Sequence, residues 1–169
     1  MTKTQEVDEL TKQYIRDNYL ADPETGKIFS LKTNRVVGSY ARGYERIHIL
    51  KKDYKSHRIC WFLYYDNFPK TQIDHINGIK NDNRKINLRE ATPSQNNQNT
   101  TIGIKNKSGY KGVNKRVSII KKPYRAEISY NGNKKHLGYF HTKEEAHTAY
   151  VEASLKYHGE FSPYARKTS

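Results

Sequence analysis

The stretch IDHINGIKNDNRKINLREATPSQNNQN, residues 73–99, decides how this chain is interpreted. It places Asp74 and His75 side by side and follows them with a series of asparagines. Asparagine is a poor helix former and a common turn residue, and Asn77-Gly78 predicts a tight reversal. A structural loop would account for the asparagines. A catalytic site would account for the aspartate and the histidine as well. The composition and motifs of the rest of the chain bear on which of the two alternatives is favoured.

Composition favours two small modules that bind a polyanion. The chain has 169 residues, only 34% of them hydrophobic, which predicts two compact modules in place of one large core. The net charge of +14 and the 14 tyrosines indicate a nucleic-acid partner, because Lys and Arg displace counterions from phosphates and tyrosines supply flat contacts. A basic surface that serves only solubility is the alternative.

Cysteine usage and hydropathy exclude several classes of protein. The single cysteine, Cys60, excludes an internal disulfide and a multi-cysteine zinc site. It lies within the apolar run ICWFLYY, which predicts a buried thiol. The first ten residues lack the hydrophobic segment of a secretory signal, and no stretch approaches transmembrane length. We therefore expect a cytoplasmic protein, neither secreted nor bound to a membrane.

The first hundred residues show the patterns of helices and strands. Residues 6–19 and 56–68 predict helices, the second of them buried and capped by Ser56. The stretch RGYERIHIL predicts a strand with Ile47 and Ile49 on one face. Its other face carries Arg42, Tyr44, Arg46 and His48. That face could contact DNA, or it could be an ordinary solvated surface.

Asp74 and His75 offer the chemistry that phosphodiester hydrolysis needs. The reaction requires an activated water, charge stabilisation at the phosphate and help for the leaving oxygen. A neutral imidazole can accept the proton of water near neutral pH. A divalent ion held by oxygen ligands can stabilise the leaving oxygen. Asp74 would bind such an ion while His75 points at the scissile phosphate.

The segment resembles the ββα-metal active site of HNH endonucleases, in the branch of phage and intron-encoded homing endonucleases. The pattern DH.(D/N)G...(D/N)N...NLR..T of that branch is matched, and the upstream HRICWFLYYDNFP resembles the helix that precedes it. The matching positions are Asp74, His75, Asn77, Gly78, Asn83, Asn87, Leu88, Arg89 and Thr92. The resemblance implies an α+β fold, with an N-terminal nuclease domain over residues 1–100 and a ββα-metal core at about 71–99.

The resemblance also implies roles for individual residues. His75 would be the general base, and Asn87 would hold the loop and orient the histidine. Asp74 and Asn96 would bind one divalent metal ion per active site. Asn97 and Asn99 are alternatives to Asn96, since the run QNNQN permits a different register. Carboxamide oxygens suit Mg²⁺ or Mn²⁺ better than Zn²⁺.

The rest of the chain forms a second module, behind a predicted linker at residues 101–108. Three short strands are predicted, with Asn131-Gly132 as a hairpin turn. A helix follows, with Thr142 and Glu145 as a capping box and Gly159 as its C-terminal cap. The stretches GYKGV, AEI and LGYF make residues 109–169 resemble the AP2 DNA-binding domain. That resemblance implies a three-stranded antiparallel sheet that enters the major groove and packs on one helix.

Several side chains are predicted to contact double-stranded DNA. In the second module these are Lys111, Asn114, Arg116, Lys134 and His136, and in the first Arg42, Arg46 and Arg89. Several family positions that usually hold arginine or tryptophan carry Lys, Asn, Ser or His here. Base readout and nonspecific binding to phosphate therefore both remain open.

The patterns together predict a metal-dependent, site-directed DNA endonuclease of the HNH homing type. One active site attacks one strand at a time, so a monomer would nick DNA, and a homodimer or sequential action would be needed to cut both strands. A DNA-binding regulator with an inactive nuclease fold is the alternative from another class. An RNA-directed nuclease is a third possibility.

Overall fold

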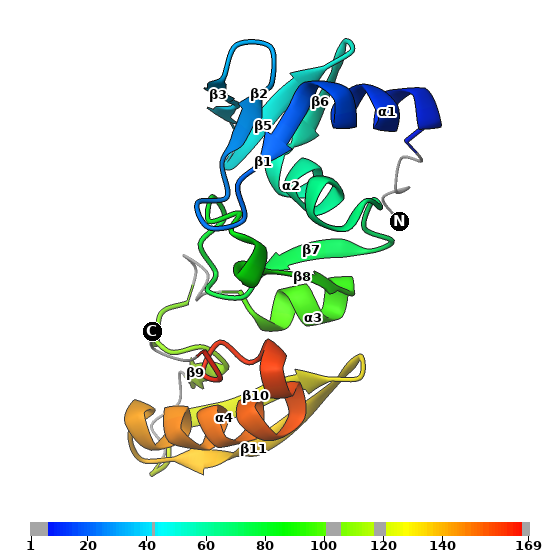
Figure 1. Ribbon diagram of the computed structural model, residues 1–169. Coiled ribbons are helices and arrows are strands. Elements are labelled where there is room, and N and C mark those ends of the chain that lie inside the picture. Colours follow the sequence, from blue (N-terminus) through cyan, green and yellow to red (C-terminus); the bar gives the residue numbers. More distant parts are fainter. Residues whose placement is uncertain (1–6, 42, 101–105, 117–120, 167–169) are drawn as a thin grey trace. The chain divides into compact units, whose positions relative to one another are not determined.

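The fold was analysed in a computed structural model that describes residues 7–41, 43–100, 106–116 and 121–166 (Figure 1). The described residues form an α+β protein with four α-helices and small antiparallel sheets. The chain divides into two compact units, Met1–Pro93 and Ser94–Ser169. The predicted domain limits at residues 100 and 109 remain predictions. None of the described helices has the length and apolar character required to cross a membrane.

The first unit begins with α1 (Glu9–Asn18), which packs on a small sheet. Asp8 caps the helix, because its carboxylate accepts a hydrogen bond from the backbone nitrogen of Thr11 at 2.8 Å. The chain then forms an antiparallel sheet of β1 (Tyr19–Ala21), β2 (Ile28–Ser30) and β3 (Arg35–Val37). Ile15 and Ile28 of these elements belong to the hydrophobic core.

A second antiparallel sheet supports the buried helix. It consists of β4 (Ser39–Ala41), β5 (Tyr44–Ile49) and β6 (Lys52–Lys55), followed by α2 (Ser56–Tyr65). The predicted alternation of β5 is confirmed, since Ile47 and Ile49 are buried and His48 is exposed. They pack with Ile59 and Phe62 of α2 in the same core.

The predicted cap of α2 is wrong. Lys55 occupies the N-cap position without a side-chain cap, and Ser56 is the first helical residue. Ser56 is fully buried, and its hydroxyl has no hydrogen-bond partner among the described residues. Packing of the helix on the core has therefore set its start, not local capping chemistry. Cys60 is fully buried, as predicted.

The last pair of strands in this unit carries the aspartate and histidine. β7 (Gln72–His75) pairs antiparallel with β8 (Leu88–Ala91). The segment between them makes a turn at Gly78 and a short 3₁₀ helix, η1 (Lys85–Asn87). The register places Asp74 opposite Arg89 and His75 opposite Leu88. After β8 comes α3 (Pro93–Gln98), most of which belongs to the second unit.

The second unit is a three-stranded antiparallel sheet packed on one helix, as predicted (Figure 1). The strands β9 (Val113–Lys115), β10 (Tyr124–Tyr130) and β11 (Asn133–Phe140) precede α4 (Lys143–His158) and η2 (Gly159–Phe161). Asn131 and Gly132 form the hairpin turn with φ values of 50° and 77°. The capping box of α4 is present. The likeness to the AP2 domain in particular remains a prediction.

Candidate active site

Asp74 lies at the end of β7 in a buried ion pair. The residue is 4% exposed, and both Nε and Nη2 of Arg89 donate to its Oδ2, at 2.9 and 2.8 Å. The cross-strand register brings the two side chains together. A buried carboxylate requires such a partner, since desolvation of an unpaired charge is costly. Arg89 was predicted to contact DNA, and its guanidinium binds the carboxylate of Asp74.

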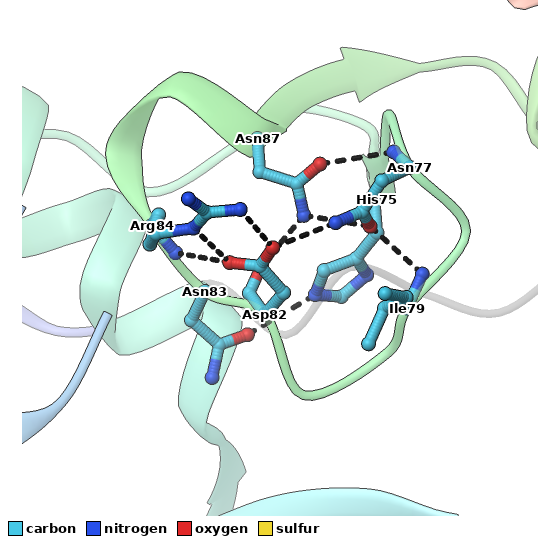
Figure 2. Close-up of polar contacts among 7 residues, drawn as sticks. All are labelled: His75, Asn77, Ile79, Asp82, Asn83, Arg84 and Asn87. Atoms are coloured by element: carbon cyan, nitrogen blue, oxygen red, sulfur yellow. Dashed lines mark hydrogen bonds and ion pairs between the residues drawn. The ribbon is translucent and has the colours of Figure 1, made fainter. Parts of the chain in front are cut away.

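His75 is the last residue of β7 and is 5% exposed. Its Nε2 lies 3.1 Å from Oδ1 of Asn83, a residue that is 1% exposed (Figure 2). The ring also meets the ring of His57 edge-on, with centroids 5.2 Å apart. Burial lowers the pKa of His75 below its usual value. The imidazole is therefore neutral near neutral pH and able to accept a proton.

Asn87 closes the loop that joins the two strands (Figure 2). Its Oδ1 accepts a hydrogen bond from the backbone nitrogen of Asn77 at 2.9 Å. Its Nδ2 donates to Oδ1 of Asn77 at 3.0 Å and to the carbonyl of Asp82 at 2.7 Å. These contacts fit the predicted role of holding the loop. The contact to the His75 ring comes from Asn83, whose place in the motif carried no predicted role.

Arg84 and Asp82 brace the same loop. Arg84 donates through Nε and Nη2 to the two carboxylate oxygens of Asp82, at 2.8 and 2.6 Å. Asp82 also accepts from Nδ2 of Asn77 at 2.6 Å, and these bonds lower its pKa, that of Arg84 most (Figure 2). The asparagines of the motif therefore form a hydrogen-bonded loop. The structural interpretation of these asparagines is confirmed, and the catalytic interpretation of the stretch remains a prediction.

The asparagines predicted to complete the metal site lie on and after α3. Asn96 and Asn97 are part of the helix, and Asn99 follows it. Asn99 is 4% exposed, and its Oδ1 accepts from Nη2 of Arg166 at 2.8 Å. Asn96, Asn97 and Asn99 remain the predicted alternatives for the additional ligand.

The donor set suits a hard cation. The described part of the chain contains no cluster of three or more His, Cys, Asp or Glu side chains that could hold a metal ion. The predicted ligands are the carboxylate of Asp74 in the first unit and the carboxamide of Asn96 in the second. Oxygen donors of this kind fit Mg²⁺ or Mn²⁺, which retain several waters and need few protein ligands.

The predicted DNA-binding residues of the first unit differ in their surroundings. Arg46 lies on β5 between Ser39 of β4 and Lys55 of β6. Its Nε is buried and has no hydrogen-bond partner among the described residues. Arg42 lies outside the described residues.

In the second unit, several predicted DNA-binding residues line one cavity. Its volume is about 450 Å³, and its lining comprises Asn114, Lys134 and Lys111, Glu127 and Ser129 of β10, Ser94, Asn97 and Gln98 of α3, and Tyr150 and His158 of α4. Lys134 is 75% exposed at its side chain and lies 3.7 Å from Glu127. This arrangement places cations and hydrogen-bonding groups on one surface, as a nucleic-acid interface requires.

The other predicted residues of this unit contact neighbouring groups. Arg116 lies over the ring of Tyr139 at 4.9 Å, and the ring of His136 is 4.6 Å from the same tyrosine. Lys111 donates from Nζ to the carbonyls of Gln98 and Thr100, both at 2.6 Å. Burial lowers the pKa of Lys111 to about 8. Lys111 thus binds backbone carbonyls at the C-terminal end of α3. The sequence patterns did not predict this contact.

Comparison with known proteins places the site in a family context. Residues 54–98 match the family model of the HNH endonucleases. No curated protein and no solved structure matched the chain. The matched part includes α2, β7, the asparagine-braced loop, β8 and α3. This part of the chain, with Asp74, His75 and Asn87, is therefore similar to HNH endonucleases, which supports a nuclease that acts on DNA.

Proposed function

We propose that the protein is a metal-dependent, site-directed DNA endonuclease of the homing type. The observation that carries the proposal is the buried, neutral imidazole of His75, held through Nε2 by Asn83 beside the carboxylate of Asp74. Such a ring is poised to accept a proton, and the position of both residues inside the HNH-like segment supports hydrolysis of a phosphodiester bond.

The chemistry divides between His75 and a bound cation. The imidazole of His75 accepts a proton from the attacking water. Asp74 and Asn96 would hold Mg²⁺ or Mn²⁺, which when bound supplies charge stabilisation at the phosphate and the leaving oxygen. Asn87 keeps the loop closed, and Arg89 holds the carboxylate of Asp74 in place.

The second unit serves as the DNA anchor. A nuclease site this small contacts few bases, so additional contact area must supply specificity, and a tethered sheet raises the effective concentration at the target. Lys134, Asn114 and Arg116 would contact the double helix, either at base edges or at phosphates. Each chain contains one His75, so a monomer nicks one strand, and a homodimer would cut both.

Loss of the imidazole tests the proposal. Purified wild-type protein and the His75→Ala variant are incubated with supercoiled plasmids that carry fragments of the source genome, in Mg²⁺ or Mn²⁺. We expect His75→Ala to nick roughly 10²–10⁴-fold more slowly, the contribution typical of a general base. His141→Ala is the matched control, because His141 is exposed and its described contact is a backbone one to Glu145.

Two outcomes would contradict the proposal. Equal rates for wild type and His75→Ala would remove His75 from its role as the base. Plasmid binding without any metal-dependent nicking would favour a regulator with an inactive nuclease fold. RNA duplexes offered in parallel separate a DNA-directed from an RNA-directed nuclease.

A further inference from the structure

Three cations gather around one tyrosine ring in the first unit. The ammonium group of Lys55, on β6, lies 4.4 Å from the centroid of the Tyr44 ring, and that of Lys80 lies 5.0 Å from the same centroid. Arg46 belongs to β5, as Tyr44 does, and the register places it directly opposite Lys55. Lys80 comes from the loop between β7 and β8, so segments far apart in the chain bring the three charges together. We call Arg46, Lys55, Lys80 and the ring of Tyr44 the cation cradle.

The charges of the cation cradle are not balanced by neighbouring carboxylates. Among the described residues, no carboxylate forms an ion pair with Lys55 or Lys80, and Nε of Arg46 is buried without a hydrogen-bond partner. Burial lowers the pKa of Lys55 below its usual value, and so do the charges of Arg46, Arg58 and Lys80. The charges that act on the ammonium group of Lys55 thus all have its own sign.

This placement of charge works against the stability of the fold. Like charges directly opposite each other on paired strands are destabilising, and Arg46 and Lys55 form such a pair. Lys55 is also the N-cap residue of α2, whose first turn contains no acidic residue. A cation at this end of a helix opposes the macrodipole, which favours negative charge there. An anion bound at the cation cradle would offset both costs.

The cation cradle lies beside the predicted general base. The ring of Tyr44 meets the ring of His57 edge-on with centroids 5.5 Å apart, and His57 meets His75 in the same way at 5.2 Å. A single ring, that of His57, thus separates the cradle from the imidazole of His75. A DNA strand carries a phosphate at every nucleotide, so a strand whose scissile phosphate meets His75 presents further phosphates close by.

We propose that the cation cradle binds the phosphate backbone of the DNA strand next to the scissile phosphate, and thereby sets where that strand passes His75. The inference rests on the proposed function, in which DNA is the substrate. Of the members of the cradle, only Arg46 is predicted from the sequence to contact DNA, so Lys55, Lys80 and Tyr44 are added to the interface. The ligand is a phosphodiester recognised by its charge, and such contacts fix the register of a protein on the duplex without reading its sequence.

Removal of one charge at a time tests the cation cradle. Lys55→Met and Lys80→Met keep a long side chain and remove the ammonium group. The full-length proteins are titrated onto labelled duplex fragments of the source genome, without added metal ion, at several salt concentrations. We expect the slope of log K against log salt concentration to become shallower by about 0.9 in each variant, the contribution of one phosphate contact.

Lys85→Met is the matched control for both variants. Lys85 also lies over a tyrosine ring of the first unit, that of Tyr65, at 4.9 Å from its centroid. The substitution therefore removes the same charge from the same kind of contact, outside the cation cradle. It should leave the slope at its wild-type value.

Thermal unfolding in the absence of DNA separates phosphate binding from a structural role. Since the charges around Lys55 repel it, Lys55→Met should melt at the wild-type temperature or above it. A lysine whose role is structural would lower the melting temperature when replaced and leave the salt slope unchanged. Lys55→Arg retains the charge and should retain the wild-type slope.

The outcomes distinguish this inference from the proposed function. Wild-type slopes in both Lys55→Met and Lys80→Met overturn the inference, and nicking by the wild-type protein would then still support the proposed function. If Lys55→Met fails to fold, Lys80→Met decides alone, because Lys80 is exposed. If both slopes become shallower but wild-type protein nicks no DNA in Mg²⁺ or Mn²⁺, the cation cradle is supported and the proposed function fails.

Discussion

Asn87 has a partner for its oxygen and two partners for its nitrogen. One side chain joins the backbone of Asn77, the amide of Asn77 and the carbonyl of Asp82. The residue is 5% exposed, so water cannot replace these partners. A buried polar group left without its partner costs about 1–3 kcal/mol. Much of the stability of the loop that follows His75 thus depends on one carboxamide.

We expect Asn87→Ala to lower the free energy of unfolding by roughly 2–4 kcal/mol. The substitution removes the hydrogen-bond partner of the Asn77 backbone nitrogen and of the Asp82 carbonyl at once. Chemical denaturation followed by circular dichroism measures the change. Asn81→Ala is the control, because Asn81 is exposed in the same loop and should shift stability by less than about 0.5 kcal/mol. Equal stability of the two variants would show that the loop does not depend on Asn87.

Individual residues also show where sequence patterns succeed. The motif singles out Asp74, His75 and Asn87, and the structure places all three at the β7–β8 pair and its loop. It does not reveal Glu45, because this residue reaches Asn83 from a separate sheet and no local spacing connects them. It also leaves Arg89 among the DNA-binding candidates, since only the strand register shows that Arg89 faces Asp74.

Among the elements, the turn before β9 is held against α4 at Gly112. This glycine has a φ of +72°, and a Cβ built on it would lie 2.0 Å from the ring of Tyr150. Tyr150 is 4% exposed and belongs to the core beneath the sheet. The turn can therefore approach α4 only where a side chain is absent.

A pair of glycine variants tests this close approach. Gly109→Ala has the same kind of backbone, with a φ of +79°, but no atom within 4 Å, so it should cost about 1 kcal/mol. Gly112→Ala adds overpacking against Tyr150, and we expect a total loss of about 3 kcal/mol. Thermal unfolding of both full-length variants measures the difference. Equal melting temperatures would show that the ring of Tyr150 moves aside freely.

Local chemistry predicted some elements better than others. The capping box of α4 and the Asn131-Gly132 turn are confirmed because each depends on neighbouring residues alone. The start of α2 was mispredicted because burial of Ser56 in the core outweighed its capping tendency. Strand pairing was beyond prediction for β1, β2 and β3, which are each three residues long and too short to show alternation.

For the whole molecule, the net charge of +14 should make DNA binding strongly dependent on salt. Each phosphate contact contributes about −0.9 to the slope of log K against log salt concentration. We expect Lys134→Met to make this slope shallower by about 0.9, since the side chain of Lys134, on β11, is 75% exposed. Fluorescence anisotropy with a labelled duplex, titrated at several salt concentrations, measures the slope.

Lys12→Met provides the comparison for this measurement. Lys12 belongs to α1 in the first unit and forms an ion pair with Glu9 at 3.0 Å. It is not among the residues predicted to contact DNA. Its removal should leave the slope unchanged. A Lys134→Met slope equal to that of wild type would remove Lys134 from the interface, whatever the affinity.

The contacts at the end of α3 bear on how such a protein could be re-engineered. Lys111 donates hydrogen bonds to the carbonyls of Gln98 and Thr100, and Arg166 donates to the carbonyl and to Oδ1 of Asn99. A chimera joined at residue 100 would lose both cations, and with them the hydrogen bonds to four oxygens of residues 98–100. Exchange of the part after residue 100 would therefore succeed only if the incoming segment supplied its own pair of basic side chains to these oxygens.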